Sequence, residues 1–266
     1  VRRGRIASAR GFTTAFTRRH LFAMSGAGCV AVIGFSGVVG SAALKHLAES
    51  KAFSVIKALG RDPSKAPQGV VGVKAPSTDL AAVSAALNGV DVAIVIPPGN
   101  DSRIEGGTTA LRACKAAGVP HVVLMSVDVH DQDQSKHLFG RQFTEIEKEC
   151  PEGSTILRCP FFIDNLWGDK DTIKDMGQIF APIGPDVKGR LIAVDDIGIS
   201  LAAAAQAPAK VKGKVYALTM PPVSRAQIAA AFSSALGRPV DYVKVPRLLA
   251  LTLALGPART FTLTLS

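Results

Sequence analysis

Three glycines spaced three residues apart form the motif in this sequence that points most clearly to ligand binding. Gly34, Gly37 and Gly40 lie where the apolar run CVAVIGF passes into an Ala- and Leu-rich segment typical of a helix. At a strand-to-helix turn, glycines permit a tight bend and let the backbone approach a ligand, while the helix amides attract an anion. We therefore predict that this turn binds the diphosphate of a dinucleotide, the alternative being a flexible loop without a ligand. The expected contacts are Gly34, Ser36, Gly37, Val38, Val39 and Gly40.

Positive charge follows the second apolar run, where the adenosine ribose of a dinucleotide is expected. NAD-binding folds usually carry an acidic residue at this point, whereas an arginine can pair with a 2′-phosphate. Here Arg61 comes directly after the run, and Lys65 lies four residues further on. We therefore favour NADP(H) as the cofactor, with NAD(H) possible. Two alternatives remain: both cations are surface charges on a loop, or Asp62 contacts the ribose.

Two further strand ends are expected to reach the cofactor. Asp79 and Leu80 follow the third apolar run and are placed to meet the adenine edge. Pro97 and Pro98 end the fourth run, where the backbone passes close to the cofactor and a helical conformation is unwanted. The predicted site thus draws on the ends of four successive apolar runs.

Short β-branched runs alternate with Ala- and Leu-rich segments over the first part of the chain. Runs this apolar are typical of strands buried on both faces, and their alternation with helices indicates parallel strands. We predict an α/β fold with a doubly wound parallel sheet, of Rossmann type, over residues 28–160. The rhythm breaks there, so residues 161–266 are assigned to a small C-terminal α/β substrate portion, interleaved with the core and lying over the cofactor edge. In it we expect a strand at 215–219, a helix at 223–236 and a strand at 240–245.

The positive charge of the chain is concentrated at its N-terminus. The net charge is +10, six arginines lie before residue 29, and no acidic residue precedes Glu49. An acid-free segment that mixes Arg with Ser, Thr and Ala is typical of organelle import sequences. Residues 1–27 are therefore predicted to be a transit segment for a mitochondrion or plastid, a solvated basic tail on a cytoplasmic protein being the alternative. Because aromatic residues make up only 6% and form no stacking cluster, nucleic acid is not an expected partner.

Cysteine and histidine positions do not indicate a metal site. Cys29, Cys114, Cys150 and Cys159 lack short paired spacing and lie in or beside apolar runs, so we expect reduced core thiols. The segment VDVHDQDQ is interpreted as a solvated loop. The longest late apolar stretch, at residues 248–256, is too short to cross a bilayer, so no transmembrane segment is expected.

Several segments together resemble the NmrA-like branch of the atypical short-chain dehydrogenase/reductases. They span residues 29–246 and are the G-x-x-G-x-x-G turn, ALGRDPSK, STDL, VDVAIVIPP, LRACKAAGVPHVVLMSV, STILRCPFFIDNL and VYALTMPPVSRAQIAAAFSSALGRPVDYVKVP. The resemblance implies a Rossmann domain with a small substrate domain, and NADP(H) or NAD(H) as the ligand. Two residues depart from the branch: Phe35 replaces a small residue in the turn, and Thr78 replaces a glycine before Asp79. Phe35 is expected to crowd the diphosphate unless it points into the core.

The resemblance also implies which residues meet the nicotinamide end. The wider superfamily uses a Tyr-x-x-x-Lys pair to pass a proton, and this sequence lacks it, since its tyrosines are Tyr216 and Tyr242 alone. On the matching helix, Arg141 is the best positional equivalent and His137 the next. Arg141 would hold the cofactor or polarise a substrate oxygen; the alternative is a surface charge paired with Glu145.

Further positions at this end come from the same resemblance. Ser126 matches the family's serine at the end of the fifth run, where it would bond a ribose or substrate oxygen. A buried serine bonded to the backbone is the alternative. Pro160 and Phe161 are expected to contact the cofactor, and Asp164 and Asn165 are expected beside the substrate cleft.

Two classes of function fit these features. An NAD(P)H-binding oxidoreductase of the NmrA-like type would reduce a quinone or small carbonyl, with a proton from water or substrate. A non-catalytic redox sensor or accessory subunit would bind the dinucleotide and contact another protein. The expected partner is accordingly a small-molecule substrate or a protein, and the sequence assigns no catalytic residue.

Overall fold

The computed structural model describes residues 4–5, 28–129 and 137–246, which fall into two compact units. The first unit comprises Val1–Phe162 and Ile192–Met220, and the second comprises Ile163–Leu191 and Pro221–Ser266. The chain thus leaves the first unit, returns to it for residues 192–220 and leaves it again. The predicted transit segment, apart from Gly4 and Arg5, lies outside the described residues.

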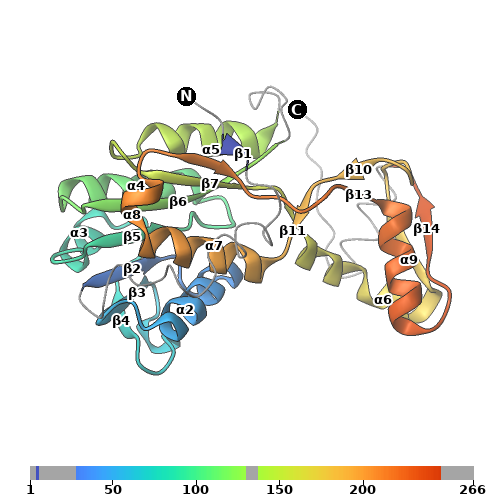
Figure 1. The fold of residues 1–266 in the computed structure, drawn as a ribbon, viewed down its shortest axis with the longest axis horizontal. Coiled ribbons are helices and arrows are strands. Elements are labelled where there is room, and N and C mark those ends of the chain that lie inside the picture. Colours follow the sequence, from blue (N-terminus) through green and yellow to red (C-terminus); the bar gives the residue numbers. More distant parts are fainter. Residues whose placement is uncertain (1–3, 6–27, 130–136, 247–266) are drawn as a thin grey trace. The chain divides into compact units, whose positions relative to one another are not determined.

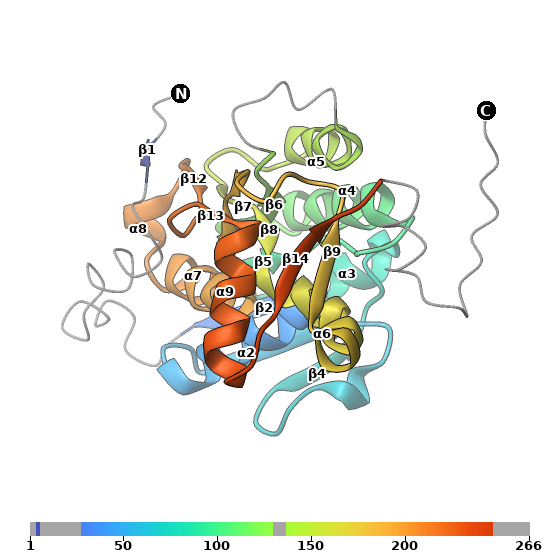
Figure 2. The same cartoon turned by 90° about the vertical axis from the view of Figure 1, so that its right-hand side faces the viewer.

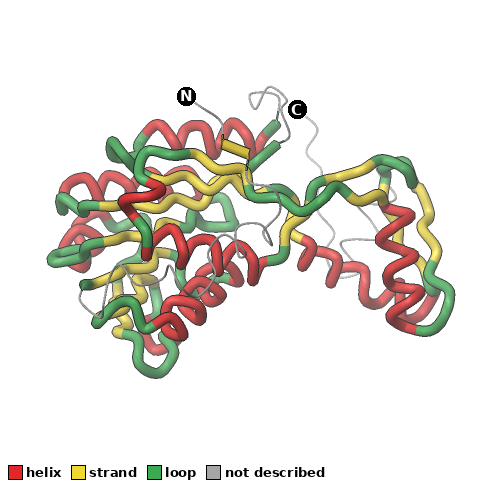
Figure 3. The backbone as a smooth tube through the Cα atoms, in the orientation of Figure 1, coloured by secondary structure: helices red, strands yellow, loops and turns green. Residues whose placement is uncertain are grey.

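A parallel sheet with helices on both faces forms the first unit, which confirms the predicted doubly wound fold (Figures 1 and 3). Its strands are β1 (Gly4–Arg5), β2 (Cys29–Ile33), β3 (Val55–Gly60), β4 (Val71–Lys74), β5 (Val92–Val95), β6 (His121–Val127), β7 (Thr155–Cys159) and β12 (Val215–Ala217). Neighbours pair in parallel in the order β1-β12-β7-β6-β5-β2-β3-β4. The order reverses between β2 and β5, and in open α/β sheets such a switch point is where ligands bind.

Two helical layers cover this sheet. Its helices are α2 (Val38–Ser50), the short η1 (Pro63–Lys65), α3 (Leu80–Ala86), α4 (Arg103–Ala116), α5 (Leu138–Lys148), α7 (Val194–Gln206) and α8 (Pro208–Val211). Helices α2 and α7 pack side by side on one face, and α3, α4 and α5 cover the other (Figures 1 and 2). Gly198 of α7 fits closely against α2, because a Cβ there would lie 2.7 Å from the Ala42 side chain.

The central strands are buried on both faces. Every residue of β2 and β5 is buried, as are the first six residues of β6. This burial explains why these strands appear in the sequence as continuous apolar runs. Each fully buried aliphatic side chain contributes about 1.5–3 kcal/mol, so the middle of the sheet is a main source of stability. Within the described ranges, no helix combines the length and the apolarity needed to cross a bilayer.

Strand β12 lies elsewhere than expected. Residues 215–219 are predicted to belong to the C-terminal portion, but Val215–Ala217 pair with Ile156, Leu157 and Arg158 of β7 in the main sheet. All three residues of β12 are half-buried. The sequence of so short a strand indicates extended structure. It does not indicate which sheet the strand joins, because that depends on partners distant in sequence.

The second unit contains a few short elements. They are η3 (Ile163–Asp169), α6 (Lys170–Met176), β9 (Gln178–Ala181), β10 (Lys188–Gly189), β13 (Val223–Ser224), α9 (Arg225–Leu236) and β14 (Asp241–Lys244). Of the two remaining two-residue strands, β8 (Phe161–Phe162) ends a segment of the first unit, and β11 (Leu191–Ile192) spans the boundary between the two units. Strand β14 pairs in parallel with β9, and β10 pairs antiparallel with β13. Ser224 and Gln227 form a capping box at the start of α9, which ends before Gly237 at a φ of +64°.

Candidate functional site

The glycine turn joins β2 to α2, and two of its glycines are required by the packing of the turn itself. Gly34 has a φ of +88°, and a Cβ there would lie 2.4 Å from the carbonyl oxygen of Ile96, just after β5. A Cβ on Gly40 would lie 2.3 Å from the carbonyl oxygen of Gly34. Any larger residue at either position would clash with backbone. These glycines hold the start of α2 against the ends of β2 and β5, at the switch point.

Gly37 differs, because the space beside it is open. A Cβ there would meet only the carbonyl oxygen of Gly34, at 3.7 Å, and its φ of −80° suits any residue. Gly37 is the N-cap of α2, and no side chain caps this helix. In the described part of the chain, the amides of Val38, Val39 and Gly40 have no hydrogen-bond acceptor. Free amides at a helix N-terminus suit a diphosphate, and glycine at position 37 leaves room for it.

Phe35 points into the core, so it does not crowd the turn. Its side chain is 2% exposed and lies against Gly60 at the end of β3, where a Cβ would be 2.8 Å from the ring. Gly60 does not have a positive φ, so the ring and not the backbone conformation requires a glycine there. The next residues, Ser36 and Val38, are exposed. The departure from the family at Phe35 therefore leaves the outer side of the turn open.

The charged residues after β3 are used in different ways. Asp62 caps η1: its Oδ1 accepts hydrogen bonds from the Ser64 amide at 3.1 Å and from the Ser64 hydroxyl at 2.6 Å. These bonds lower the pKa of Asp62. Arg61 is exposed and forms no hydrogen bond or ion pair with the described residues, and Lys65 is also exposed. The carboxylate is thus held by its own turn, and the guanidinium is available to a ligand.

Asp79, at the start of α3, is also engaged by its own helix. It is the N-cap, and its Oδ1 accepts a hydrogen bond from the Ala82 amide at 3.0 Å. The preceding Thr78 does not have a positive φ, so the absence of a glycine there causes no backbone strain. The other predicted contacts on this side are Leu80, which is 47% exposed, Pro97, which is buried, and Pro98, which is half-buried.

Beyond the switch point, polar side chains at the ends of β6 and β7 bond to one another. Ser126 is fully buried, and its Oγ donates to Oε1 of Glu147, in α5, at 2.6 Å. Arg158 of β7 donates from Nε to the same oxygen at 2.9 Å and from Nη2 to Oε2 at 2.5 Å. The hydrogen bonds with Glu147 raise the pKa of Arg158. The single hydroxyl proton of Ser126 is therefore directed at a carboxylate, and its contact with ribose or substrate stays a prediction.

Glu147 and Arg158 did not emerge from the sequence as functional candidates. The available signal was an arginine inside the apolar run STILRCP, because a charge in a buried strand must find a partner. Its partner lies on the preceding helix, and no local pattern identifies it. The pair joins α5 to the sheet next to the predicted nicotinamide end, so these residues position that end of the fold.

Arg141 and His137 lie at the start of α5. Arg141 is exposed, and its backbone amide donates to the carbonyl oxygen of His137, the N-cap residue. Glu145, considered as a partner for Arg141, forms an ion pair with Lys148 at 2.7 Å. The cofactor-binding role of Arg141 stays a prediction. The remaining predicted positions are Pro160, which is buried, Phe161, which is 47% exposed, and Asp164 and Asn165, which are exposed in η3.

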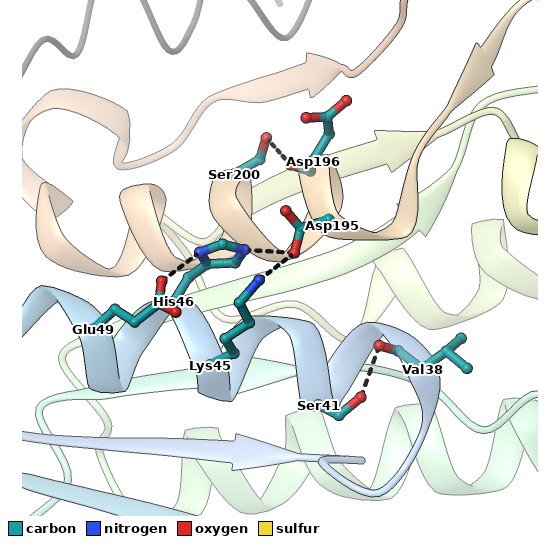
Figure 4. A network of polar contacts seen from close by, with 8 residues as sticks. All are labelled: Val38, Ser41, Lys45, His46, Glu49, Asp195, Asp196 and Ser200. Carbon is teal, nitrogen blue, oxygen red and sulfur yellow. Dashed lines mark hydrogen bonds and ion pairs between the residues drawn. The ribbon is translucent and has the colours of Figure 1, made fainter.

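A polar network joins α2, the helix that opens at the glycine turn, to the first turn of α7 (Figure 4). His46 lies between two carboxylates: Nε2 is 2.8 Å from Oδ1 of Asp195, and Nδ1 is 3.4 Å from Oε2 of Glu49. Nζ of Lys45 also reaches Oδ1 of Asp195, at 3.3 Å. The hydrogen bond from His46 is the main cause of a lowered pKa at Asp195. The network connects to α7 the helix whose amides form the candidate anion site, through ion pairs that are mostly exposed.

The cysteine thiols and the remaining acidic side chains of the described residues do not form a metal site. Among the residues that the structure describes, no group of three or more His, Cys, Asp or Glu side chains is arranged so that it could hold a metal ion. His130 and Asp131, in the predicted solvated loop, lie outside those residues. Burial raises the pKa of Cys114 and Cys150 to about 12 and also raises the pKa of Cys29. These free cysteines are therefore protonated near neutral pH.

Comparison with known proteins gives the family. The NmrA-like family model matches residues 27–259. An NAD(P)H azoreductase of Xenophilus azovorans is 33% identical over 226 residues, which cover 81% of this chain and 77% of that protein. An NADPH-dependent quinone oxidoreductase of Escherichia coli, solved with NADPH, has the same fold, with a TM-score of 0.72, 24% identity and coverage of 82% and 78%. So does a Citrobacter triphenylmethane reductase solved with NADP(H), with a TM-score of 0.71, 20% identity and coverage of 82% and 79%. The chain therefore belongs to the NmrA-like family, with the NAD(P)-binding Rossmann fold of the atypical short-chain dehydrogenase/reductases.

Proposed function

We propose that this protein is an NADPH-dependent reductase of the NmrA type that passes a hydride to a quinone or a related conjugated acceptor. The observation that carries the proposal is the uncapped start of α2, where Gly37 leaves space and three amides have no acceptor in the described chain. The relatives support it: one is named as an NAD(P)H azoreductase, and a quinone oxidoreductase of the same fold was solved with NADPH.

The preference for NADPH rests on the charges after β3. Ser64 holds the Asp62 carboxylate, which is the group that would otherwise favour the ribose hydroxyls of NADH. Arg61 is left exposed beside it and can form paired, charge-assisted hydrogen bonds with a 2′-phosphate. Lys65, at the end of η1, adds a second positive charge.

The chemistry needs positioning more than it needs an acid. NADPH, when bound, would supply the hydride; overall, a quinone, NADPH and one proton give a hydroquinone and NADP⁺. The glycine turn would fix the diphosphate, and Arg61 would fix the adenosine end, so that the opposite end is directed toward β5 and β6. Water can provide the proton, which fits a site whose Ser126 proton is directed at Glu147.

The test is NADPH oxidation, followed by absorbance, with the full chain over a panel of quinones, azo compounds and enals. We expect turnover with at least one acceptor, in proportion to protein concentration, and its loss in the Gly37→Val variant. Tight NADPH binding without turnover on any acceptor would reject the reductase.

Binding without turnover would support a non-catalytic dinucleotide sensor or accessory subunit, which two observations favour. The chain lacks a Tyr-x-x-x-Lys pair, and its buried Ser126 is bonded to Glu147. A sensor would bind NADPH through the same turn and respond by changing its affinity for a protein partner.

A further inference from the structure

Arg103 is held in place by three residues of a neighbouring helix. It is the first residue of α4, and its guanidinium carbon lies 4.7 Å from the centroid of the Phe139 ring and 6.0 Å from that of Phe143. Its Nη1 donates to Oε1 of Gln142 at 2.5 Å. The three partners have the spacing i, i+3 and i+4 in α5, so they share one face of that helix. The guanidinium therefore covers one face of the Phe139 ring.

The two rings differ in what surrounds them. Phe143 is 6% exposed and belongs to the core, whereas Phe139 is 52% exposed even with the guanidinium over it. Single exposed apolar side chains are common and need no explanation by themselves. Here, however, Arg103 is half-buried, and burial lowers its pKa. Partial burial of a cation costs part of its hydration free energy. A phenyl ring that simply lies on the surface does not need such a contact.

The fold places this ring on the acceptor side of the switch point. Helix α4 follows β5 and α5 follows β6, so the first turns of both helices lie at the carboxyl edge of the sheet. Arg61 follows β3, on the other side of the switch point. A dinucleotide with its 2′-phosphate at Arg61 would cross the switch point and direct its nicotinamide toward β5 and β6. Phe139 thus belongs to the half of the edge at which an acceptor would approach.

We propose that Phe139 is a specificity-determining residue for planar aromatic acceptors, which stack on the ring face that Arg103 leaves open. Arg103 is the positioning residue that holds the ring. This inference rests on the proposed reductase function. Offset-stacked aromatic pairs change affinity by about three- to tenfold. Because stacking acts on acceptor binding, its loss raises KM and leaves kcat unchanged.

The decisive variant is Phe139→Leu, which keeps an apolar side chain but removes the ring. Leu138→Ala is the matched control, because Leu138 is the neighbouring residue and is similarly exposed, at 58%. With 2-methyl-1,4-naphthoquinone as acceptor, we expect Phe139→Leu to raise KM about three- to tenfold, with kcat unchanged. Calorimetry of the NADP⁺-loaded protein should show the same loss of naphthoquinone affinity without turnover. The affinity for NADPH should stay the same in both variants.

Arg103→Met tests the positioning role, because it keeps an unbranched apolar stem and removes the cation. It should raise KM for the naphthoquinone by a smaller factor than Phe139→Leu, and the two changes combined should cost no more than Phe139→Leu alone. An unchanged KM in Phe139→Leu, an equal rise in Leu138→Ala, or a loss of NADPH affinity would overturn the inference while turnover stands. Absence of turnover in the unmodified protein would instead reject the proposed function and this inference with it.

Discussion

The two halves of the carboxyl edge of the sheet use their polar groups differently. On the side of β2 and β3, the amides that open α2 and the guanidinium of Arg61 have no partner within the described residues. On the side of β6 and β7, Ser126, Glu147 and Arg158 bond to one another. The first half keeps hydrogen-bonding capacity for a ligand, and the second uses it to stabilise the fold. Mutations of these polar groups should therefore affect different quantities, namely the affinity for NADPH in the first half and the stability of the fold in the second.

The largest expected effect is the loss of NADPH binding in Gly37→Val. The side chain would occupy the space above the α2 amides, so we expect affinity to fall by at least about a hundredfold. The φ of −80° accommodates valine, so the free energy of unfolding should change by no more than about 1 kcal/mol. Calorimetry and urea unfolding measure the two quantities. The control is Gly40→Ala, whose Cβ would lie 2.3 Å from a backbone oxygen. Its main effect should be a lower free energy of unfolding. Retained NADPH affinity in Gly37→Val would remove the basis of the comparison.

Arg158→Met should lower the free energy of unfolding and leave the affinity for NADPH unchanged. It leaves the Glu147 carboxylate, which is 13% exposed, without its bidentate partner, at a cost of about 2–3 kcal/mol. The matched control is Arg112→Met, which breaks an exposed ion pair with Glu149 and should cost less than about 1 kcal/mol. Urea unfolding of both variants gives the difference. Equal costs would show that the pair beside β7 is no more important than a surface pair.

Arg61→Ala should reduce the preference for NADPH over NADH. We expect NADPH affinity to fall about tenfold, equivalent to about 1.4 kcal/mol, because the charge-assisted bonds to the 2′-phosphate are lost. NADH affinity should not change. Lys65→Ala should have a smaller effect of the same sign, and Arg112→Ala should have none. Equal affinities of the unmodified protein for NADPH and NADH would indicate that Arg61 does not face the ribose.

The smallest expected effect comes from the first residue of β6, and it is seen in the pH dependence of stability. His121 is 4% exposed, and its ring nitrogens have no partner among the described residues. Burial, with a smaller contribution from Lys212, lowers its pKa in the folded state. The unfolded chain therefore binds the proton more readily, so stability is complete above about pH 6.5 and declines as the pH falls below it. The loss should stay below about 1 kcal/mol at pH 6. Unfolding at pH 8 and pH 6 should show that His121→Phe flattens this slope, and an unchanged slope would contradict it.

The central fold could be predicted because its signals are local. Strands β2, β5 and β6 are buried on both faces, so their sequences are continuously apolar, and the helices between them are Ala- and Leu-rich. Strand β12 could not be placed in the same way. Its three half-buried residues join β7, about sixty residues earlier in the chain, and only the assembled sheet offers that partner.

The same division holds for the candidate site. Gly34, Gly37 and Gly40 were found from their spacing, since glycine at a turn serves backbone geometry. The sequence did not show that Gly37 alone faces open space. Nor did it show that the carboxylates of Asp62 and Asp79 cap short helices, although both residues precede a helix start. Side-chain partners depend on rotamers and neighbours, which residue type and spacing do not determine.

The contact between Phe35 and Gly60 has a consequence for how this sequence can vary over evolutionary time. A single substitution at position 60 would collide with the ring, whereas a smaller residue at position 35 would leave a void beside a glycine. Neither step is favourable alone, but an exchange of volume between the two positions preserves the packing. We therefore expect the two sites to covary among homologues. Gly60→Ala, harmful here, should be tolerated when Phe35 is changed to a small residue.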